Sequence, residues 1–362
     1  ATPNSPCADD VSDFLDLTIE EAPSGTAGAD QESCGTADVS LSGASANNFT
    51  TVEWSTDGTG SFDSESLLNP VYTPTTADLA SGSVTLTLTI NGNTPCSTPA
   101  IDELTLTLQE PPAVGAGLDE YVCENTTTYT LAGTATNYSS VEWTSTGTGT
   151  ILNNDNLNTS YPISAADITA GSVTFTLEAT GVDGCASTTE SDDRQIVFVA
   201  EPAVNAGANA VTCSDSDYDN TDATASDYAS LAWSTNGDGT FSDNDVLNPT
   251  YTPGPTDISN GTVRLTMTAT PNSPCADDVS DFLDLTFEEA PSGTAGPDQE
   301  SCGTADVSLS GSSASNYTTV QWSTDGTGSF DDETLLKPVY TPSAADVNSG
   351  SVTLTLTING NT

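Results

Sequence analysis

Tryptophan recurs at an almost constant interval along this 362-residue chain, and this period constrains the fold more than any other feature. The four residues are Trp54, Trp143, Trp233 and Trp322, at intervals of 89, 90 and 89 residues. Four tyrosines keep the same spacing, namely Tyr72, Tyr161, Tyr251 and Tyr340. Self-similarity at a fixed period is the signature of repeated structural units. The chain is therefore expected to be a row of copies of one small domain.

A longer period lies above the first one. Residues 1–22 return at 269–290 with a single change, an isoleucine that becomes phenylalanine. Residues 23–94 return as 291–362 with modest changes. Three of the 90-residue copies thus form a super-repeat of 268 residues. This pattern indicates tandem duplication within a longer array.

The two periods together set the domain boundaries. We name as repeats 1 to 4 the predicted domains 23–111, 112–201, 202–290 and 291–362. Residues 1–22 are expected to be the last strand of a preceding or partner repeat, and repeat 4 is expected to lack its last strand. Two explanations stay open. Either the chain is a segment of a continuous polypeptide with further repeats, or Phe14–Glu20 of one copy completes repeat 4 of another copy by donor-strand exchange.

Within each repeat, apolar residues alternate with hydroxyl residues. In repeat 1, residues 84–90 read Val-Thr-Leu-Thr-Leu-Thr-Ile, which places the apolar side chains on one face of a strand. Residues 104–108 continue the pattern, and helical periodicity is absent. Further strands are predicted at Ala27–Ser33, Val39–Gly43, Thr51–Trp54 and Val71–Tyr72. About seven short strands and one tryptophan per repeat are typical of an immunoglobulin-like sandwich.

The recurring aromatic residues are assigned to the core of each sandwich. Each tryptophan lies in the middle of a predicted strand, beside an apolar residue. This position favours a core side chain over an exposed ligand platform. A recurring aspartate, Asp78 in repeat 1, is expected to cap a helical turn before the sixth strand.

The charge balance excludes several functions. The chain has 52 acidic residues, three basic residues and no histidine, which gives a net charge of −49. Such a polyanion repels nucleic acids and acidic membrane surfaces, and no apolar stretch is long enough for membrane insertion. Without histidine, neither a Ser-His-Asp triad nor a His-metal site is possible. We therefore expect no enzyme, no nucleic-acid partner and no membrane-inserted segment.

Eight cysteines fall into two periodic sets. One set is Cys7, Cys96, Cys185 and Cys275, and the other is Cys34, Cys123, Cys213 and Cys302. In the predicted strand order the two sets lie at opposite poles of a sandwich, roughly 25 Å apart, too far for a disulfide. Interdomain bonds Cys34–Cys185 and Cys123–Cys275 are therefore favoured. Pairing within one repeat, such as Cys34–Cys96, stays open under a different topology. Disulfides also indicate an extracellular setting.

The acidic residues also raise the possibility of calcium, which takes six to eight oxygen ligands. The candidate metal ligands form two groups in repeat 3, Asp215, Asp217 and Asp219 in one, and Asp238, Asp243 and Asp245 in the other. No stretch has the spacing of an EF-hand. A solvated acidic surface is the favoured interpretation, so the cofactor prediction is none, or calcium.

Three segments carry a resemblance to a known family. They are Ala-Gly-Pro-Asp-Gln at 295–299, Trp-Ser-Thr-Asp-Gly-Thr-Gly-Ser-Phe at 322–330 and Ser-Gly-Ser-Val-Thr-Leu-Thr-Leu-Thr at 349–357. They resemble PKD-like and Ig-like repeats of giant surface proteins of Bacteroidota, including gliding-motility adhesins exported by type IX secretion. The resemblance covers the whole chain and implies a stalk or adhesive fibre. Repeat 3 departs from the pattern, because Val204–Asn209 lacks the acidic residue.

These observations predict an all-β chain of tandem immunoglobulin-like (PKD-like) sandwiches that form an elongated rod. Its expected function is that of a structural and adhesive segment of a cell-surface or secreted fibre, concerned with attachment or motility-linked adhesion. Its partners would be neighbouring repeats, other copies in a fibre, and a cell-surface or glycan receptor. The alternatives are a filament subunit joined by exchanged strands and a carbohydrate-binding repeat array.

Overall fold

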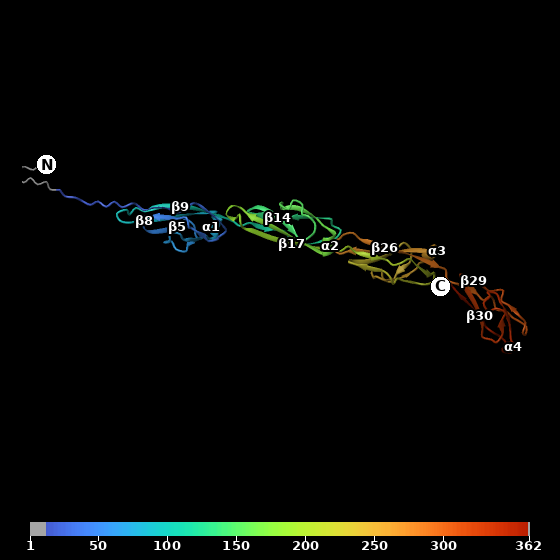
Figure 1. Cartoon of the computed structure of the whole chain (residues 1–362). Helices are drawn as coiled ribbons and strands as arrows, with labels where there is room; N and C mark the ends of the chain where they lie inside the picture. Colours follow the sequence, from blue (N-terminus) through green and yellow to red (C-terminus); the bar gives the residue numbers. More distant parts are fainter. Residues whose placement is uncertain (1–11, 361–362) are drawn as a thin grey trace, which may run out of the picture. The chain divides into compact units, whose positions relative to one another are not determined.

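The computed structural model describes residues 12–360, which divide into two compact units. The first unit runs to Phe198 and contains repeat 1 and nearly all of repeat 2, and the second starts at Val199, near the end of repeat 2, and contains repeats 3 and 4. Figure 1 colours them in chain order, and nearly all of their regular structure is β-strand. The predicted all-β fold of tandem sandwiches is confirmed. No helix among residues 12–360 is long and apolar enough to cross a membrane.

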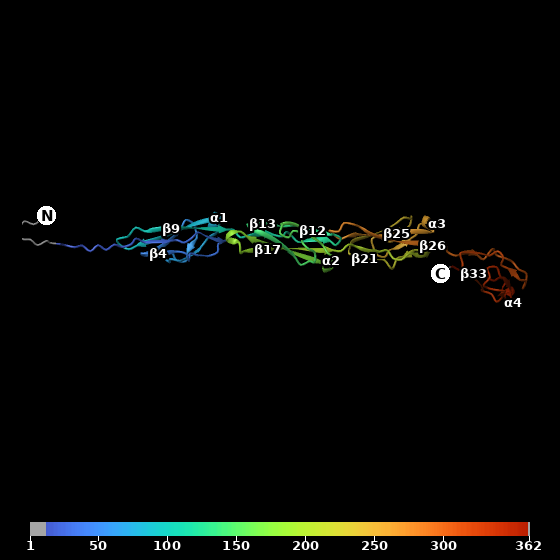
Figure 2. The ribbon, with the colours of Figure 1, turned by 45° about the horizontal axis from the view of Figure 1, so that its top comes forward.

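Repeat 1 has two layers. The first is a four-stranded sheet whose strands, in spatial order, are β2 (Gln31–Cys34), β9 (Ala100–Gln109), β8 (Ser83–Gly92) and β5 (Phe49–Thr56). The β2–β9 pair is parallel and the other pairs are antiparallel. The second layer comprises a three-stranded sheet of β3 (Val39–Ser40), β7 (Val71–Thr73) and β6 (Ser61–Phe62), and a ribbon of β1 (Ser24–Thr26) and β4 (Ser45–Asn47). Helix α1 (Thr76–Ser81) lies at one end of this sandwich (Figures 1 and 2).

The alternation along β8 and β9 builds the core between these layers. Val84, Leu86, Leu88 and Ile90 are all less than 5% exposed, and Leu104, Leu106 and Leu108 face them from β9. The threonines between them are half-buried or exposed on the other face. Each fully buried aliphatic side chain contributes about 1.5–3 kcal/mol to folding. The pairing of β8 with β9 therefore supplies much of the stability of repeat 1.

Repeat 2 keeps the same order of elements. Its elements are β10 (Ala113–Gly115), β11 (Glu120–Cys123), β12 (Thr128–Ala132), β13 (Thr134–Thr136), β14 (Tyr138–Ser145), β15 (Asn158–Pro162), α2 (Ala165–Ala170), β16 (Ser172–Gly181), the 3₁₀ turn η1 (Asp183–Cys185) and β17 (Thr189–Val199). The larger sheet has the order β11-β17-β16-β14, and its apolar face packs into a second separate core.

Repeat 3 is built in the same way in the second unit. Its elements are β18 (Ala203–Asn205), β19 (Ala210–Cys213), β20 (Tyr218–Asp219), β21 (Thr224–Ser226), β22 (Tyr228–Thr235), β23 (Thr240–Phe241), β24 (Thr250–Thr252), α3 (Pro255–Asn260), β25 (Thr262–Pro271) and β26 (Val279–Glu288). Its larger sheet has the order β19-β26-β25-β22, and it covers a third core.

Repeat 4 differs in its larger sheet. Its elements are β27 (Ser292–Thr294), β28 (Val307–Ser308), β29 (Ser313–Ser315), β30 (Thr319–Thr324), β31 (Ser329–Phe330), β32 (Val339–Thr341), α4 (Ala344–Ser349) and β33 (Leu354–Asn359). Among residues 12–360, β33 pairs only with β30, so the larger sheet has two strands instead of four. The side chains of β33 are half-buried or exposed.

The strand predicted at Ala27–Ser33 is wrong in one respect. Only β2, from Gln31 onward, is a strand in this range; residues 27–30 connect it to β1, and the two strands belong to different layers of the sandwich. Gly28 lies between them with φ +102°, a left-handed conformation that favours glycine. The chain turns at this glycine and passes from one layer to the other, which a pattern of alternating residues does not reveal.

The recurring tryptophans and tyrosines are buried in all four repeats, with exposed fractions of 3% or less. In repeat 1, Phe62 lies between the two rings, with centroids 5.9 Å from Trp54 and 5.0 Å from Tyr72. Repeat 2 has Ile151 in place of that phenylalanine, and Phe175 of β16 packs against Tyr161 instead, at 4.9 Å. In repeat 2 the phenylalanine that packs against the tyrosine therefore comes from β16 of the larger sheet, whereas in repeat 1 it comes from β6.

Replacing Trp143 by alanine is expected to lower the free energy of unfolding of repeat 2 by about 3–5 kcal/mol, because the side chain is fully buried and leaves a large cavity. Denaturant unfolding of the whole chain measures this change. Leu118→Ala is the control, since Leu118 is 85% exposed in the same repeat, and it should change stability little. Equal effects of the two substitutions would contradict the placement of Trp143 in the core.

Candidate functional site

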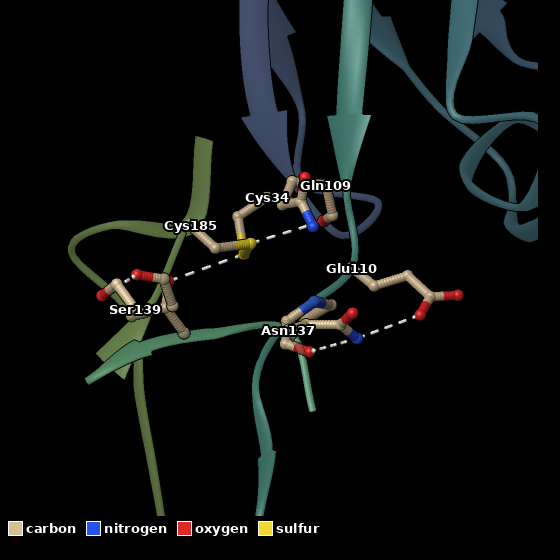
Figure 3. The surroundings of a disulfide bond; sticks show 9 residues. Cys34, Gln109, Glu110, Asn137, Ser139 and Cys185 are labelled. Carbon is tan, nitrogen blue, oxygen red and sulfur yellow. Dashed lines mark hydrogen bonds between the residues drawn. A yellow bond between two sulfur atoms is a disulfide. The ribbon is translucent and has the colours of Figure 1, made fainter. Parts of the chain in front are cut away.

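The joint between repeats 1 and 2 is the most distinctive site of the first unit, because a disulfide crosses it (Figure 3). Cys34 is the last residue of β2, and Cys185 is the last residue of η1. Their Cα atoms lie 4.7 Å apart, and 151 positions separate them in the sequence. Both side chains are shielded, and that of Cys185 is fully buried. The bond therefore joins one pole of repeat 1 to the facing pole of repeat 2.

The local sequence lets the two poles come close. Gly184 precedes the second cysteine, and a Cβ atom there would lie 2.9–3.1 Å from the backbone of Ser33. Glycine is therefore needed for η1 to pack against the end of β2. The sulfur of Cys185 also lies 3.3 Å from the carbonyl oxygen of Gln109, the last residue of β9. Figure 3 shows this carbonyl beside the disulfide.

A polar contact beside the disulfide joins the same two repeats. The Nδ2 atom of Asn137 donates to Oε2 of Glu110 at 3.1 Å and to the carbonyl oxygen of Pro111 at 3.3 Å. The same contact recurs between Asn48 and Glu21 at 3.0 Å, and between Asn316 and Glu289 at 2.7 Å. These asparagines have positive φ, which asparagine tolerates better than most residues. Each glutamate directly follows a last strand, or the segment equivalent to one, so the contact recurs where one repeat meets the next.

The structure places the other predicted cysteines as follows. Cys96, Cys213 and Cys302 are free thiols, the last two of them exposed. The alternative pair Cys34–Cys96 is therefore not formed. The predicted pair Cys123–Cys275 would join the two compact units and stays a prediction, although neither residue is a free cysteine. Cys7 lies outside the described residues.

The sulfur of Cys96 makes the same contact with a carbonyl oxygen as the sulfur of Cys185 does at the joint. The thiol of Cys96 donates to the carbonyl oxygen of Glu20 at 3.3 Å, as the sulfur of Cys185 meets the carbonyl of Gln109 at the same distance. Cys275 has the same relation to the carbonyl of Val199, at 3.4 Å. The three described cysteines of this set thus each lie against the end of the preceding last strand or of the segment equivalent to one.

A second recurring site lies inside each sandwich, where a tyrosine hydroxyl meets a buried aspartate. In repeat 1, the hydroxyl of Tyr72 donates to Oδ2 of Asp78 at 3.1 Å, and Asp78 is only 2% exposed. The carboxylate also accepts the backbone N–H groups of Thr59 at 2.7 Å and Thr75 at 3.0 Å. It therefore ties the turn after β5 to the start of α1.

Burial raises the pKa of Asp78, but hydrogen bonds from Thr59 and Thr75 outweigh it and lower the pKa to about 2. The pKa of Asp167 in repeat 2 is lowered to about 2 in the same way, by bonds from Thr148 and Ser164 that outweigh burial. Desolvation by burial raises the pKa of Tyr72, which keeps its hydroxyl protonated as a donor. Hydrogen-bond donors of the protein thus stabilise this buried charge.

The predicted capping role of Asp78 needs one correction. The N-cap of α1 is Thr75, and Asp78 is the third helical residue, whose carboxylate accepts from the N-cap backbone to complete a capping box. Ser164 and Ser343 are the N-caps in repeats 2 and 4. Repeat 3 has Gly254, which has no side chain, and Asp238 supplies the missing cap: its carboxylate accepts the backbone N–H groups of Thr256 and Asp257.

Five of the six predicted calcium ligands take part in hydrogen bonds within repeat 3. Asp238 caps α3, Asp219 accepts from the hydroxyl of Thr250 at 2.6 Å, and Asp243 accepts from the backbone N–H of Asp245 at 3.3 Å. Asp215 accepts from the hydroxyl of the neighbouring Ser216, at 3.3 Å. Over residues 12–360, no three His, Cys, Asp or Glu side chains form a group that could hold a metal ion. Calcium stays a prediction.

Two of the three basic residues have roles that sequence reasoning missed. Arg194, only 9% exposed, forms an ion pair with Glu120 at 2.6 Å and lies over the ring of Tyr129, 5.1 Å from its centroid. Arg264 pairs with Asp284 at 2.8 Å and lies 3.6 Å from the centroid of Phe282. Each cation bridges adjacent strands of its sheet. The sequence offered one signal for these roles, namely that basic residues are so rare in this acidic chain.

Asp78→Asn is expected to lower stability at neutral pH, with the deficit closing in acid. The folded-state pKa of Asp78 is about 2, against an ordinary value of 3.8. Its stabilisation, roughly 2–3 kcal/mol, is therefore present above about pH 4 and lost as the pH falls towards 2. Thermal unfolding of both proteins from pH 7 to pH 2 measures this. Glu53→Gln, at an exposed position of β5, should show a small deficit at every pH, and a pH-independent deficit in Asp78→Asn would contradict the assignment.

Comparisons with known proteins complete the description. No protein-family model and no curated protein matches the chain. Among solved structures, mouse cadherin-23 EC22–24 matches 75% of this chain and all of its own, with 13% identity and a TM-score of 0.39. Protocadherin gamma B2 extracellular cadherin domains 3–6 match 89% of this chain and 91% of theirs, with 11% identity and a TM-score of 0.37. Sidekick-1 immunoglobulin domains 1–5 match 75% and 60%, with 15% identity and a TM-score of 0.33. Similarity of this degree carries no argument about function.

Proposed function

We propose that the chain is a tension-bearing segment of an extracellular adhesive repeat protein. The observation that carries the proposal is the disulfide between Cys34 and Cys185, which joins two separately folded sandwiches. Neither cysteine belongs to either core, so the bond mainly limits how far the two sandwiches can move apart. Disulfides persist in oxidising surroundings, which supports an extracellular location.

The bond changes the path that a pulling force takes through the first unit. Force applied to the two ends enters repeat 1, crosses from Cys34 to Cys185 and leaves through β17. The residues between the two cysteines lie off this path and include most of both sandwiches. They cannot be drawn out while the bond holds. The joint thus resists both bending and extension.

The acidic surface fits the same role. With 52 acidic residues against three basic ones, like charges repel along the chain, which favours solubility and separation between neighbouring copies. The finer proposal is a cell-surface or secreted fibre of the Bacteroidota type IX adhesin kind, concerned with attachment or motility-linked adhesion, with a cell-surface or glycan receptor. It rests on the resemblance of 295–299, 322–330 and 349–357.

We propose that the chain is not an enzyme. Support comes from the absence of histidine in the sequence and from the use of the recurring aspartates as internal acceptors of backbone N–H groups. The recurring tryptophans and tyrosines are buried, so they offer no platform on which a sugar ring could stack. This burial disfavours the carbohydrate-binding alternative.

Stretching single molecules by their ends tests the proposal. The oxidised chain should unfold to a contour length about 500 Å shorter than the reduced chain, because the sequence separation of 151 positions, at about 3.3–3.6 Å each, stays behind the bond. Cys34→Ser, in a chain that also carries Cys123→Ser to remove the predicted Cys123–Cys275 bond, should reach the full length without reductant. Cys213→Ser is the control, since Cys213 is a free, exposed thiol, and it should keep the short length. Equal lengths for the oxidised and reduced chains would contradict a role of the joint under tension.

The adhesive part of the proposal has its own test. Beads coated with the oxidised chain should be retained under flow by cells or by a glycan surface, and Cys34→Ser should shorten the time for which they hold against a given force. Beads coated with a protein of similar negative charge control for non-specific attraction. Retention no greater than that of these beads, on every surface tried, would exclude adhesion by this segment.

A further inference from the structure

Each repeat carries a half-exposed aromatic residue that belongs to neither of the two recurring core sets. These residues are Phe49, Tyr138, Tyr228 and Tyr317, each five positions before the tryptophan of its repeat. Their exposed fractions are 37–39%. An aromatic ring that is partly open to water offers a ligand a large, rigid and partly apolar surface.

Repeat 2 differs from the other repeats close to this aromatic residue. The backbone N–H of each tryptophan donates to a carbonyl oxygen in the loop that follows its strand. Two positions after that carbonyl, repeats 1, 3 and 4 have an aliphatic residue that is 40–49% exposed, namely Leu67, Val246 and Leu335. Repeat 2 has Asn156 at the equivalent position. An amide thus replaces the apolar side chain of the other repeats.

Asn156 lies on the wall of a hollow with a volume of about 540 Å³, lined by residues 138–141 and 155–158. This volume is within the range of small-molecule sites, roughly 300–1,000 Å³. One wall is the start of β14, which carries Tyr138, and the other is the loop that leads into β15. The hollow therefore combines an aromatic ring with a polar loop.

Four polar side chains of the hollow have hydrogen-bonding groups to spare. They are those of Ser140, Asp155, Asn156 and Asn158, and within residues 12–360 none of them forms a hydrogen bond. The carboxylate of Asp167, in contrast, accepts from backbone N–H groups of the same repeat. Polar groups that converge on a concave surface without an internal partner bind water, which a ligand can displace if it forms the same hydrogen bonds.

The first wall of the hollow is held by a β-bulge. The register of β14 against β16 shifts between Tyr138 and Ser140. The hydroxyl of the intervening Ser139 donates to the carbonyl oxygens of Gly181 at 2.8 Å and Thr180 at 3.2 Å. A bulge of this kind redirects the side chains beside it, so the direction of Tyr138 is set by the backbone.

The second wall is tied to the core tryptophan. The indole N–H of Trp143 donates to the carbonyl oxygen of Leu157 at 3.3 Å, and its backbone N–H donates to that of Asn154 at 2.8 Å. The backbone N–H of Gly133 also donates to the carbonyl of Leu157, at 2.8 Å. Both walls are thus fixed before any ligand arrives, which lowers the entropic cost of binding.

We propose that this hollow of repeat 2 binds a neutral sugar ring of a glycan. The apolar C–H face of a pyranose would stack on the ring of Tyr138, and its hydroxyl groups would bond with Asp155, Asn156 and Asn158. A hydroxyl that donates to the carboxylate of Asp155 forms a charge-assisted hydrogen bond, which is stronger than a neutral one. Amides both donate and accept, as a sugar hydroxyl does.

Charge selects a neutral sugar over an acidic one. Asp155 is the one charged residue among the eight that line the hollow, and the whole chain has a net charge of −49. Sialic acids, uronic acids and sulfated sugars would be repelled both by this carboxylate and by the field of the chain.

This inference deepens the adhesive part of the proposed function and rests on it, because it assigns a ligand class and a site. It differs from the carbohydrate-binding repeat array, which relied on the recurring core aromatics. The site proposed here is a single one, in repeat 2, and uses a tyrosine outside both core sets.

The test titrates the ¹⁵N-labelled, oxidised whole chain with four neutral disaccharides, namely lactose, maltose, cellobiose and N,N′-diacetylchitobiose, into the millimolar range. At least one should shift the amide signals of 138–141 and 155–158 saturably and leave those of the equivalent 228–231 and 245–248 in repeat 3 unchanged. Sialyllactose, which carries a carboxylate, should bind more weakly than the neutral sugar.

Three variants locate the site. Tyr138→Ala should weaken binding by about tenfold or more, since it removes the stacking surface. Asn156→Leu should abolish binding by filling the hollow, and the fold tolerates it because Leu67 and Leu335 occupy the equivalent position. Tyr228→Ala is the matched control in repeat 3 and should bind like the original chain.

Several outcomes would overturn the proposal. They are no saturable shift with any of the four disaccharides, shifts confined to residues outside the hollow, unchanged affinity in Asn156→Leu, an equal loss in Tyr138→Ala and Tyr228→Ala, and equal binding of sialyllactose. The contour length under tension needs no sugar, so it would be unaffected. Bead retention that survives Tyr138→Ala would leave the adhesive role in place and remove only this site.

Discussion

Each sandwich depends on the pairing of its last strand with the strand before it. In repeat 1, β9 completes the four-stranded sheet, fills the core with three leucines and holds β2 in parallel register. Its final residues then contact the next repeat, through the carbonyl of Gln109 beside the disulfide and the carboxylate of Glu110. One element thus determines both the stability of a repeat and the geometry of its joint. In repeat 4, where the described residues 12–360 pair β33 with β30 alone, the identical sequence 351–360 is only half-buried.

Much of this architecture could be predicted from the sequence. The period of the tryptophans predicted tandem copies of one small fold. The alternation in residues 84–90 predicted a half-buried strand, because successive side chains of a strand point to opposite faces. The cysteine periods favoured the pair Cys34–Cys185, which the structure joins. This pair could be predicted because the strand order alone places the two cysteine sets at opposite poles of a sandwich.

Other features depend on contacts that a linear pattern does not contain. The switch of layers at Gly28 is set by one backbone angle. Phe175 and Asp238 replace groups that repeat 1 holds at other positions. Phe175 packs against the tyrosine as Phe62 does in repeat 1, and Asp238 caps the helix as Thr75 does. Asp238 and Asp219, two of the candidate calcium ligands, accept hydrogen bonds from backbone and hydroxyl groups of their own repeat. Composition counts carboxylates but does not show which ones already have donors.

The position of the disulfide has a further consequence for covalent continuity. Cys34 and Cys185 enclose the loops of two repeats within one closed ring of the chain. A protease that cuts once at any loop inside this ring opens it, but the segments before and after remain attached through sulfur. A single cut in an exposed loop, such as the one around Cys96, would therefore leave the chain covalently continuous. A chain of this kind outside the cell would survive a first cut without being severed.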